Sequence, residues 1–155
     1  MSIAPVTASV RVPLPPDTAF DLFTRRIGEW WQRQKSIAPK PWAQIVIEPG
    51  AGGRWFERDA DGAETDWGDV LAWEPPCRLL LAWRIDANFR YDPAFETEVE
   101  LRFTPVGQRE TLVSLEHRNL ERFGADAERV AGNLGGGWPT LITLYGDLAR
   151  KEKEA

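Results

Sequence analysis

The hydrophobic residues near the C-terminus are spaced as on one face of a helix. Within 135–153 they recur at i, i+3, i+4 and i+7, at Leu141, Leu144, Tyr145 and Leu148. Pro139 precedes this stripe, and its fixed φ and missing N–H suit the first turn of a helix. We therefore expect the main helix to begin at Pro139, after a turn made by the glycines at 135–137.

Alternating polarity near the N-terminus predicts a first strand followed by two short helices. Apolar and polar residues alternate over 6–12, which is the period of a half-buried strand. Prolines follow, and Asp17 is suited to cap a helix over 18–25. A second short helical piece is expected to carry Trp30 and Trp31, and the proline-containing segment 35–42 is expected to be a loop.

From residue 43 the pattern changes to short apolar runs separated by turns. The runs lie at 44–48, 53–58, 65–74, 78–85, 96–104 and 110–119. Gly, Pro and Asp mark the turns between them, and these signals predict an antiparallel meander. A short helix over 125–133 is expected to lead into the glycines.

These elements predict one α+β domain that spans residues 1–155. A strongly curved antiparallel sheet wrapped around the long C-terminal helix buries both the inner face of the sheet and the apolar stripe of the helix. The two short helices follow the first strand. Any cavity is expected between the sheet and the terminal helix.

Alternation on the last two strands predicts which side chains face the helix. The inward sets are Thr97, Val99, Leu101 and Phe103 on one strand, and Thr111, Val113, Leu115 and His117 on the other. Glu96, Glu98, Glu100 and Arg102 are expected to face water. A slip of one residue would reverse every one of these side chains.

Charge and composition exclude several classes of partner. The net charge is −5, with 24 acidic and 19 basic residues, which argues against nucleic acid or an anionic membrane as a partner. The apolar runs are too short to span a membrane. A lone cysteine, Cys77, permits no internal disulfide, and residues 1–6 lack the pattern of a signal peptide. We therefore expect a cytoplasmic protein.

Eight Trp and seven Phe residues are a large aromatic supply for a chain of 155 residues. Because Trp is rarely fully buried and its N–H seeks a partner, this supply favours a partly hollow interior. We expect a mostly apolar ligand cavity with a few polar groups. Its candidate lining residues are Trp31, Trp42, Trp55, Trp83, Phe89, Tyr91, Val113, Leu115, His117, Trp138, Leu141, Ile142 and Tyr145.

His117 and Tyr145 are the candidate polar groups of this cavity. His117 is the only histidine, and it suits either a general base acting with Tyr145 or a structural role in its strand. One His and one Cys cannot form a usual zinc cluster, so no metal site is expected. Cys77 carries no sign of activation as a nucleophile. Glu57 and Asp69 would point inwards in one of two registers, and surface exposure is the favoured expectation for both.

Several short motifs resemble the START-like, or SRPBCC, superfamily. They are Gly52-Gly53-Arg54-Trp55, Trp67-Gly68-Asp69-Val70, Pro75-Pro76 with Leu79 and Trp83, Leu115-Glu116-His117-Arg118, and Gly136-Gly137-Trp138-Pro139. Together they are most similar to bacterial relatives of the activator of heat-shock-protein-90 ATPase, over nearly the whole chain. The resemblance implies a helix-grip fold and a cavity for an apolar or aromatic small molecule. It implies no cofactor and no shared set of catalytic residues.

Three functional hypotheses follow. The first is binding of a small hydrophobic or aromatic ligand in the cavity. The second is an enzyme of cyclase or hydrolase type that acts on a polyketide-like or other aromatic substrate, through acid–base chemistry at His117 and Tyr145. The third is a cochaperone-like interaction module whose loop at 86–95 meets a chaperone. A second copy of the chain is a further candidate partner.

Overall fold

The computed structural model describes residues 3–33 and 35–154. Its elements follow in the order β1 (Val6–Val12), α1 (Pro16–Thr24), the 3-10 turn η1 (Ile27–Glu29), β2 (Trp42–Ile47), β3 (Arg54–Asp59), β4 (Glu64–Glu74), β5 (Arg78–Trp83), β6 (Thr97–Gly107), β7 (Glu110–Arg118), the 3-10 segment η2 (Leu120–Asp126) and α2 (Ala127–Glu154). This order confirms the predicted succession of one strand, short helices, six strands and a long terminal helix.

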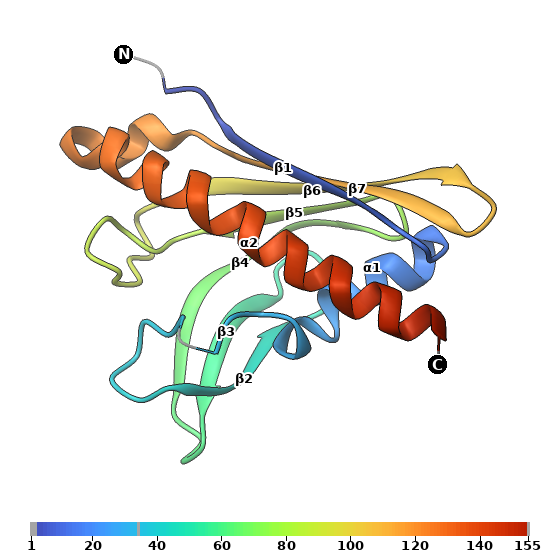
Figure 1. Cartoon of the computed structure of the whole chain (residues 1–155). Helices are drawn as coiled ribbons and strands as arrows, with labels where there is room; N and C mark the ends of the chain where they lie inside the picture. The colour runs from blue at the N-terminus through green and yellow to red at the C-terminus, as the bar shows by residue number, and fades with distance from the viewer. Residues whose placement is uncertain (1–2, 34, 155) are drawn as a thin grey trace.

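The seven strands form one antiparallel sheet in the order β1-β7-β6-β5-β4-β3-β2. The first strand therefore pairs with the last. Figure 1 shows the sheet curving around α2, with α1 beside the C-terminal half of that helix. The predicted α+β helix-grip fold, a curved antiparallel sheet wrapped around a long C-terminal helix, is confirmed.

The short helices differ from the prediction in their bounds. α1 begins at Pro16, two residues earlier than expected, because proline fits the first position of a helix. Asp17 therefore lies in the first turn, where a carboxylate favours the helix dipole, and it does not form the N-cap. The second helical piece, η1, ends at Glu29, so Trp30 and Trp31 follow it.

The prediction that the main helix begins at Pro139 is wrong. α2 starts at Ala127 and continues for 28 residues through Gly132, the glycines at 135–137 and Pro139. Tertiary packing overrides the low helix propensity of these residues. The packing comes from a separate apolar cluster, formed by Leu120, Phe123 and Ala127 with partly buried residues that include Phe95 and Trp83. Because Pro139 has no N–H, the Gly135 carbonyl loses its helical donor.

The predicted inward faces of β6 and β7 are confirmed. The inward residues of both strands are fully or almost fully buried, and the pairing sets Val99 opposite His117 and Leu101 opposite Leu115. Glu100 differs from the expectation, because it lies on the outer face but is only 8% exposed. Arg102 and Arg118 cover it, with nitrogens 3.0 and 2.9 Å from its carboxylate.

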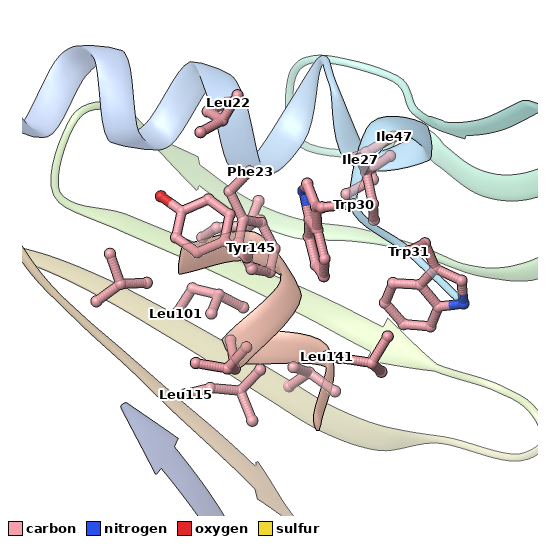
Figure 2. Packing of buried hydrophobic residues seen from close by; sticks show 14 of the residues in the cluster. Leu22, Phe23, Ile27, Trp30, Trp31, Ile47, Leu101, Leu115, Leu141 and Tyr145 are labelled. Carbon is pink, nitrogen blue, oxygen red and sulfur yellow. The ribbon is translucent and has the colours of Figure 1, made fainter. Parts of the chain in front are cut away.

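Aromatic contacts tie α2 to α1 in the core (Figure 2). The Phe23 ring lies 4.8 Å from the Trp30 ring and 5.4 Å from the Tyr145 ring, centroid to centroid. Gly146 lets α2 approach β1, since a Cβ there would lie 3.0 Å from the Val10 side chain. The part of α2 from Tyr145 onwards is therefore anchored, and the glycine-rich half of the helix, which includes the glycines at 132 and 135–137, lies away from these contacts.

Candidate functional site

A cavity of about 640 Å³ lies between the glycine-rich half of α2, the connection from η1 to β2, and the sheet. Four tryptophans from different parts of the chain line it: Trp31 after η1, Trp67 on β4, Trp83 on β5 and Trp138 on α2. Four separate segments thus bring indole rings to one space.

The four rings contact one another as a continuous wall. The Trp31 centroid lies 5.3 Å from that of Trp67 and 5.8 Å from that of Trp138, and Trp138 lies 5.8 Å from Trp83. Trp55 packs behind them, 5.5 Å from Trp67 and 5.7 Å from Trp83. Tilted and edge-to-face pairs at these distances are the favoured arrangements of aromatic rings.

A glycine in β4 positions Trp67. The register between β3 and β4 shifts beside Trp55, and this irregularity brings Trp67 to the inner face of the sheet. Gly68 packs so closely on β5 that a Cβ would lie 1.7 Å from the Ala82 carbonyl oxygen. The Trp67-Gly68 pair therefore combines an inward ring with a backbone contact that only glycine permits.

Glu57 lies beneath the cavity wall, and the expectation that it is exposed is wrong. It is 1% exposed and shares the inner face of β3 with Trp55. Its carboxylate accepts hydrogen bonds from Ser36 Oγ at 2.6 Å, Ile37 N at 2.8 Å and Trp67 Nε1 at 2.9 Å. All three donors belong to residues that line the cavity, so Glu57 joins the 35–41 loop to the tryptophan wall. Asp69, in contrast, is half-buried and pairs with Arg84 at 2.6 Å.

Four buried side-chain polar atoms have no hydrogen-bond partner among the described residues. Trp31 Nε1 and Gln32 Oε1 belong to residues that line the cavity, whereas Trp30 Nε1 and Trp55 Nε1 belong to core residues. Native proteins rarely leave such atoms unpaired, because the desolvation cost is not recovered.

His117 is buried beside the cavity and does not line it. Its Nδ1 accepts a hydrogen bond from Trp138 Nε1 at 3.1 Å, so its proton lies on Nε2, which contacts Thr97 Oγ1 at 2.7 Å. The Thr97 hydroxyl in turn donates to the Trp83 carbonyl at 3.3 Å. Burial lowers the pKa of His117 to about 3. This neutral ring, with both nitrogens engaged, holds Trp138 in the wall.

Tyr145, the other acid–base candidate, also lies outside the cavity lining. Its hydroxyl donates to the Ala19 carbonyl at 2.7 Å, and burial raises its pKa. The His117 and Tyr145 rings contact different aromatic neighbours, Trp83 and Trp138 for one and Phe23 and Trp30 for the other. The structure therefore does not bring the proposed acid–base pair together.

The other candidate lining residues divide between cavity and core. Trp31, Trp83, Phe89, Trp138 and Leu141 border the cavity. Val113, Leu115, Ile142 and Trp55 are buried in the main hydrophobic core. Trp42 lies under the Arg33 guanidinium and donates from Nε1 to the Gln32 carbonyl at 3.1 Å. Tyr91 is half-buried in the 86–95 loop, opposite Ile85.

The 86–95 loop presents one aromatic ring at the cavity. Phe89 is 64% exposed, has a positive φ of 60° and is one of the lining residues. Asp86 shapes this turn by accepting hydrogen bonds from the backbone N–H groups of Asn88 and Arg90. Phe95 is turned away and packs on Phe123 with centroids 4.9 Å apart. Partner binding through this loop stays a prediction.

Glycines of α2 leave the helical side of the cavity open. Gly136 and Gly137 line it, and a Cβ built on either would have no described atom within 4 Å apart from the adjacent residues and the backbone of the helix itself. Each such glycine costs about 1 kcal/mol relative to alanine in a helix interior. Packing does not require them, so their effect is to leave space in front of Trp138.

Several lining residues were not foreseen from the sequence: Gln32, Lys35, Ser36, Ile37, Trp67, Ile85, Asn133, Leu134 and Thr140. Four of them lie in the 32–37 segment, which has no periodic pattern. Asn133 and Leu134 lie next to the glycines that were expected to form a turn. A usable signal existed for Glu57, because it lies two residues after Trp55 and therefore on the same face of the strand.

The described ranges 3–33 and 35–154 contain no group of three or more His, Cys, Asp and Glu side chains suited to a metal ion. In the same part of the chain, every helix is too short or too polar to cross a membrane. Cys77 is exposed.

Comparison with known proteins identifies several similar structures. Txn09, an anthrahydroquino-γ-pyrone synthase, is 36% identical, with 94% of this chain and 97% of that chain covered and a TM-score of 0.65. CalC, a self-sacrificing resistance protein from Micromonospora echinospora, is 29% identical over 96% of each chain, with a TM-score of 0.69. Protein NE0264 from Nitrosomonas europaea shares the fold at 15% identity and a TM-score of 0.69 over 96% of each chain. No curated protein matches the sequence.

The family match covers most of the chain. Residues 13–143 fit the family described as Activator of Hsp90 ATPase homolog 1-like protein. This range includes the sheet from α1 onwards, the tryptophan wall and the glycine-rich half of α2. The chain therefore belongs to the START-like (SRPBCC) superfamily and, within it, to the Activator of Hsp90 ATPase homolog 1-like family.

Proposed function

We propose that this protein binds a planar aromatic small molecule in the cavity walled by Trp31, Trp67, Trp83 and Trp138. The observation that carries the proposal is the wall itself, in which four indole rings border one space of about 640 Å³. That volume is typical of small-molecule sites, which measure roughly 300–1,000 Å³ and are mostly apolar with a few polar groups. Flat aromatic rings stack on, or meet edge-on, a wall of this kind.

The name of one relative favours a ligand that carries oxygen. Txn09 is named for an anthrahydroquino-γ-pyrone, which is a fused-ring carbonyl compound. We therefore propose an aromatic carbonyl compound of polyketide type as the ligand class.

Fluorescence titration with anthraquinone tests this proposal. Anthraquinone is planar, has two carbonyl groups and absorbs in the region of tryptophan emission, so its binding beside the wall should quench the fluorescence saturably. Leu141→Trp adds a ring at a lining position and should weaken binding about tenfold or more, which corresponds to about 1.4 kcal/mol. Leu144→Trp is the matched control, because Leu144 is half-buried and does not line the cavity.

Both variants contain the same number of tryptophans, so their spectra are directly comparable. We expect Leu144→Trp to bind anthraquinone as the wild type does. Quenching that does not saturate in the wild type would refute the proposed function. Equal affinities of the Leu141→Trp variant and the wild type would show that the ligand lies elsewhere.

A further inference from the structure

We propose that Glu57, acting through Ser36, makes this cavity selective for aromatic ligands that carry a hydroxyl group. The inference rests on the proposed function and concerns a single wall of the same cavity. Ser36 would touch the ligand, and Glu57 would be the positioning residue behind it.

Three groups lie within hydrogen-bond distance of the Glu57 carboxylate. Oε1 lies 2.8 Å from Ile37 N and 2.9 Å from Trp67 Nε1, and both of these groups can only donate. Oε2 lies 2.6 Å from Ser36 Oγ, the length of a hydroxyl donating to a carboxylate. Within the described residues, Glu57 takes part in no ion pair. The Ser36 hydroxyl is therefore one of only three groups that compensate the buried carboxylate.

The Ser36 oxygen keeps one acceptor site free. Its single hydrogen is directed to Glu57, and one of its two lone pairs accepts a hydrogen bond from the backbone N–H of Trp42 at 2.8 Å. The second lone pair has no partner among the described residues. Ser36 is half-buried and lines the cavity. The cavity is thus lined at this point by a hydroxyl oxygen that can accept a hydrogen bond from a ligand and cannot donate one.

The negative charge decides this polarity, because the contacts alone do not require it. A glutamine at position 57 would accept from Ile37 and Trp67 through its carbonyl oxygen. Its NH₂ group would then donate to Ser36 Oγ and release the serine hydrogen towards the cavity. Glutamate makes Ser36 an acceptor for a ligand hydroxyl, whereas glutamine would make it a donor for a ligand ether or carbonyl.

Three related probes separate polarity from packing. Anthraquinone, 2-hydroxyanthraquinone and 2-methoxyanthraquinone share one ring system, and only the second can donate a hydrogen bond. Their dissociation constants would be measured by tryptophan quenching at about pH 6 for the wild type, Glu57→Gln, Ser36→Ala and Ser36→Thr. The wild type should prefer the hydroxy probe to the methoxy probe about tenfold, the usual size of a hydrogen bond near a charged group.

For each variant, the quantity to compare is the ratio of the dissociation constants for the methoxy and the hydroxy probe. Ser36→Ala should abolish the preference, and Ser36→Thr should restore it because the hydroxyl is retained. Glu57→Gln should abolish or reverse it. A purely structural role of Glu57 would lower the affinity for both probes equally and leave the ratio unchanged. Ser36→Ala decides the question if Glu57→Gln fails to fold, because Ser36 lies in a half-buried loop.

The outcomes separate this inference from the proposed function. If the wild type binds all three probes equally, the cavity binds aromatic molecules and the role of Ser36 and Glu57 is refuted. A preference that persists in Ser36→Ala refutes it as well. If none of the probes binds the wild type, the proposed function is overturned and the selectivity with it.

Discussion

Acidification tests the role that the structure assigns to His117. In the folded protein the ring is fully buried, and Nδ1 already accepts the Trp138 N–H. Protonation would place a hydrogen on Nδ1, break this bond and bury a positive charge. Burial accordingly lowers the pKa of His117 to about 3 in the folded state, against about 6.5 for a free histidine.

The sign and size of the effect follow from these two values. Between about pH 6.5 and about pH 3 the unfolded chain binds a proton at His117 that the folded chain does not bind, so stability falls as the pH falls. The slope approaches about 1.4 kcal/mol per pH unit. Between about pH 7 and about pH 5 we expect the free energy of unfolding to fall by about 2 kcal/mol.

Urea unfolding followed by tryptophan fluorescence measures this loss directly. His117 is the only histidine, so no other side chain has an ordinary pKa in this window. The control is His117→Gln, whose amide can accept from Trp138 and donate to Thr97 but does not titrate. Its stability should be almost independent of pH over the same range.

A flat wild-type profile would refute the reasoning, because it would mean that the folded ring accepts a proton as easily as the unfolded one. An equal loss in His117→Gln would also refute it, since another group would then be responsible. A loss confined to pH values below about 4 would point to carboxylates.

Three further predictions address the helix, the core and the sheet. Gly137→Ala and Gly132→Ala should each raise the free energy of unfolding by about 1 kcal/mol, because neither added Cβ would come within 4 Å of a described atom other than those of adjacent residues and the helix backbone. Only Gly137→Ala should weaken anthraquinone binding, since Gly137 lines the cavity and Gly132 does not; equal affinities would place the ligand away from α2. Tyr145→Phe removes the hydrogen bond to Ala19 and should cost about 1 kcal/mol in urea unfolding. The affinity of this variant for anthraquinone should be unchanged, and a weaker affinity would show that Tyr145 belongs to the binding site. Gly68→Ala forces a methyl group to within 1.7 Å of a backbone oxygen and should destabilise by more than about 4 kcal/mol in thermal unfolding, so a stable variant would contradict this strand geometry.

Periodicity sufficed to predict the fold and the inner faces of the last two strands. In β7 every second residue from Thr111 to His117 is buried, because one face of the strand meets α2 and the other meets solvent. The alternation in the sequence predicts this pattern of burial. The same pattern correctly predicted that His117 faces inwards, although it could not reveal which atoms its ring contacts.

The cavity depends on features that no periodic pattern encodes. The local preference of Pro139 for a helix start was outweighed by the apolar cluster that holds the first turns of α2. Trp67 faces inwards because of a register shift between strands, and the sequence does not mark its position. Glu57 is a charged residue whose burial depends on donors from a loop 20 residues earlier in the chain. Such contacts follow from the assembled structure alone.

The composition of α2 gives its two parts unequal local stability, because their backbone hydrogen bonds are not equally easy to break. Its C-terminal part is packed on β1 and α1 through Tyr145 and Gly146, and breaking its backbone hydrogen bonds requires those contacts to separate. The part over 132–139 contains four glycines and a proline, which raise the conformational entropy of the open chain and remove one backbone hydrogen bond. Amide hydrogens of this part will exchange with solvent through local fluctuations that leave the sheet intact. We therefore expect these amides to exchange faster than those that follow Tyr145, although both belong to one continuous helix.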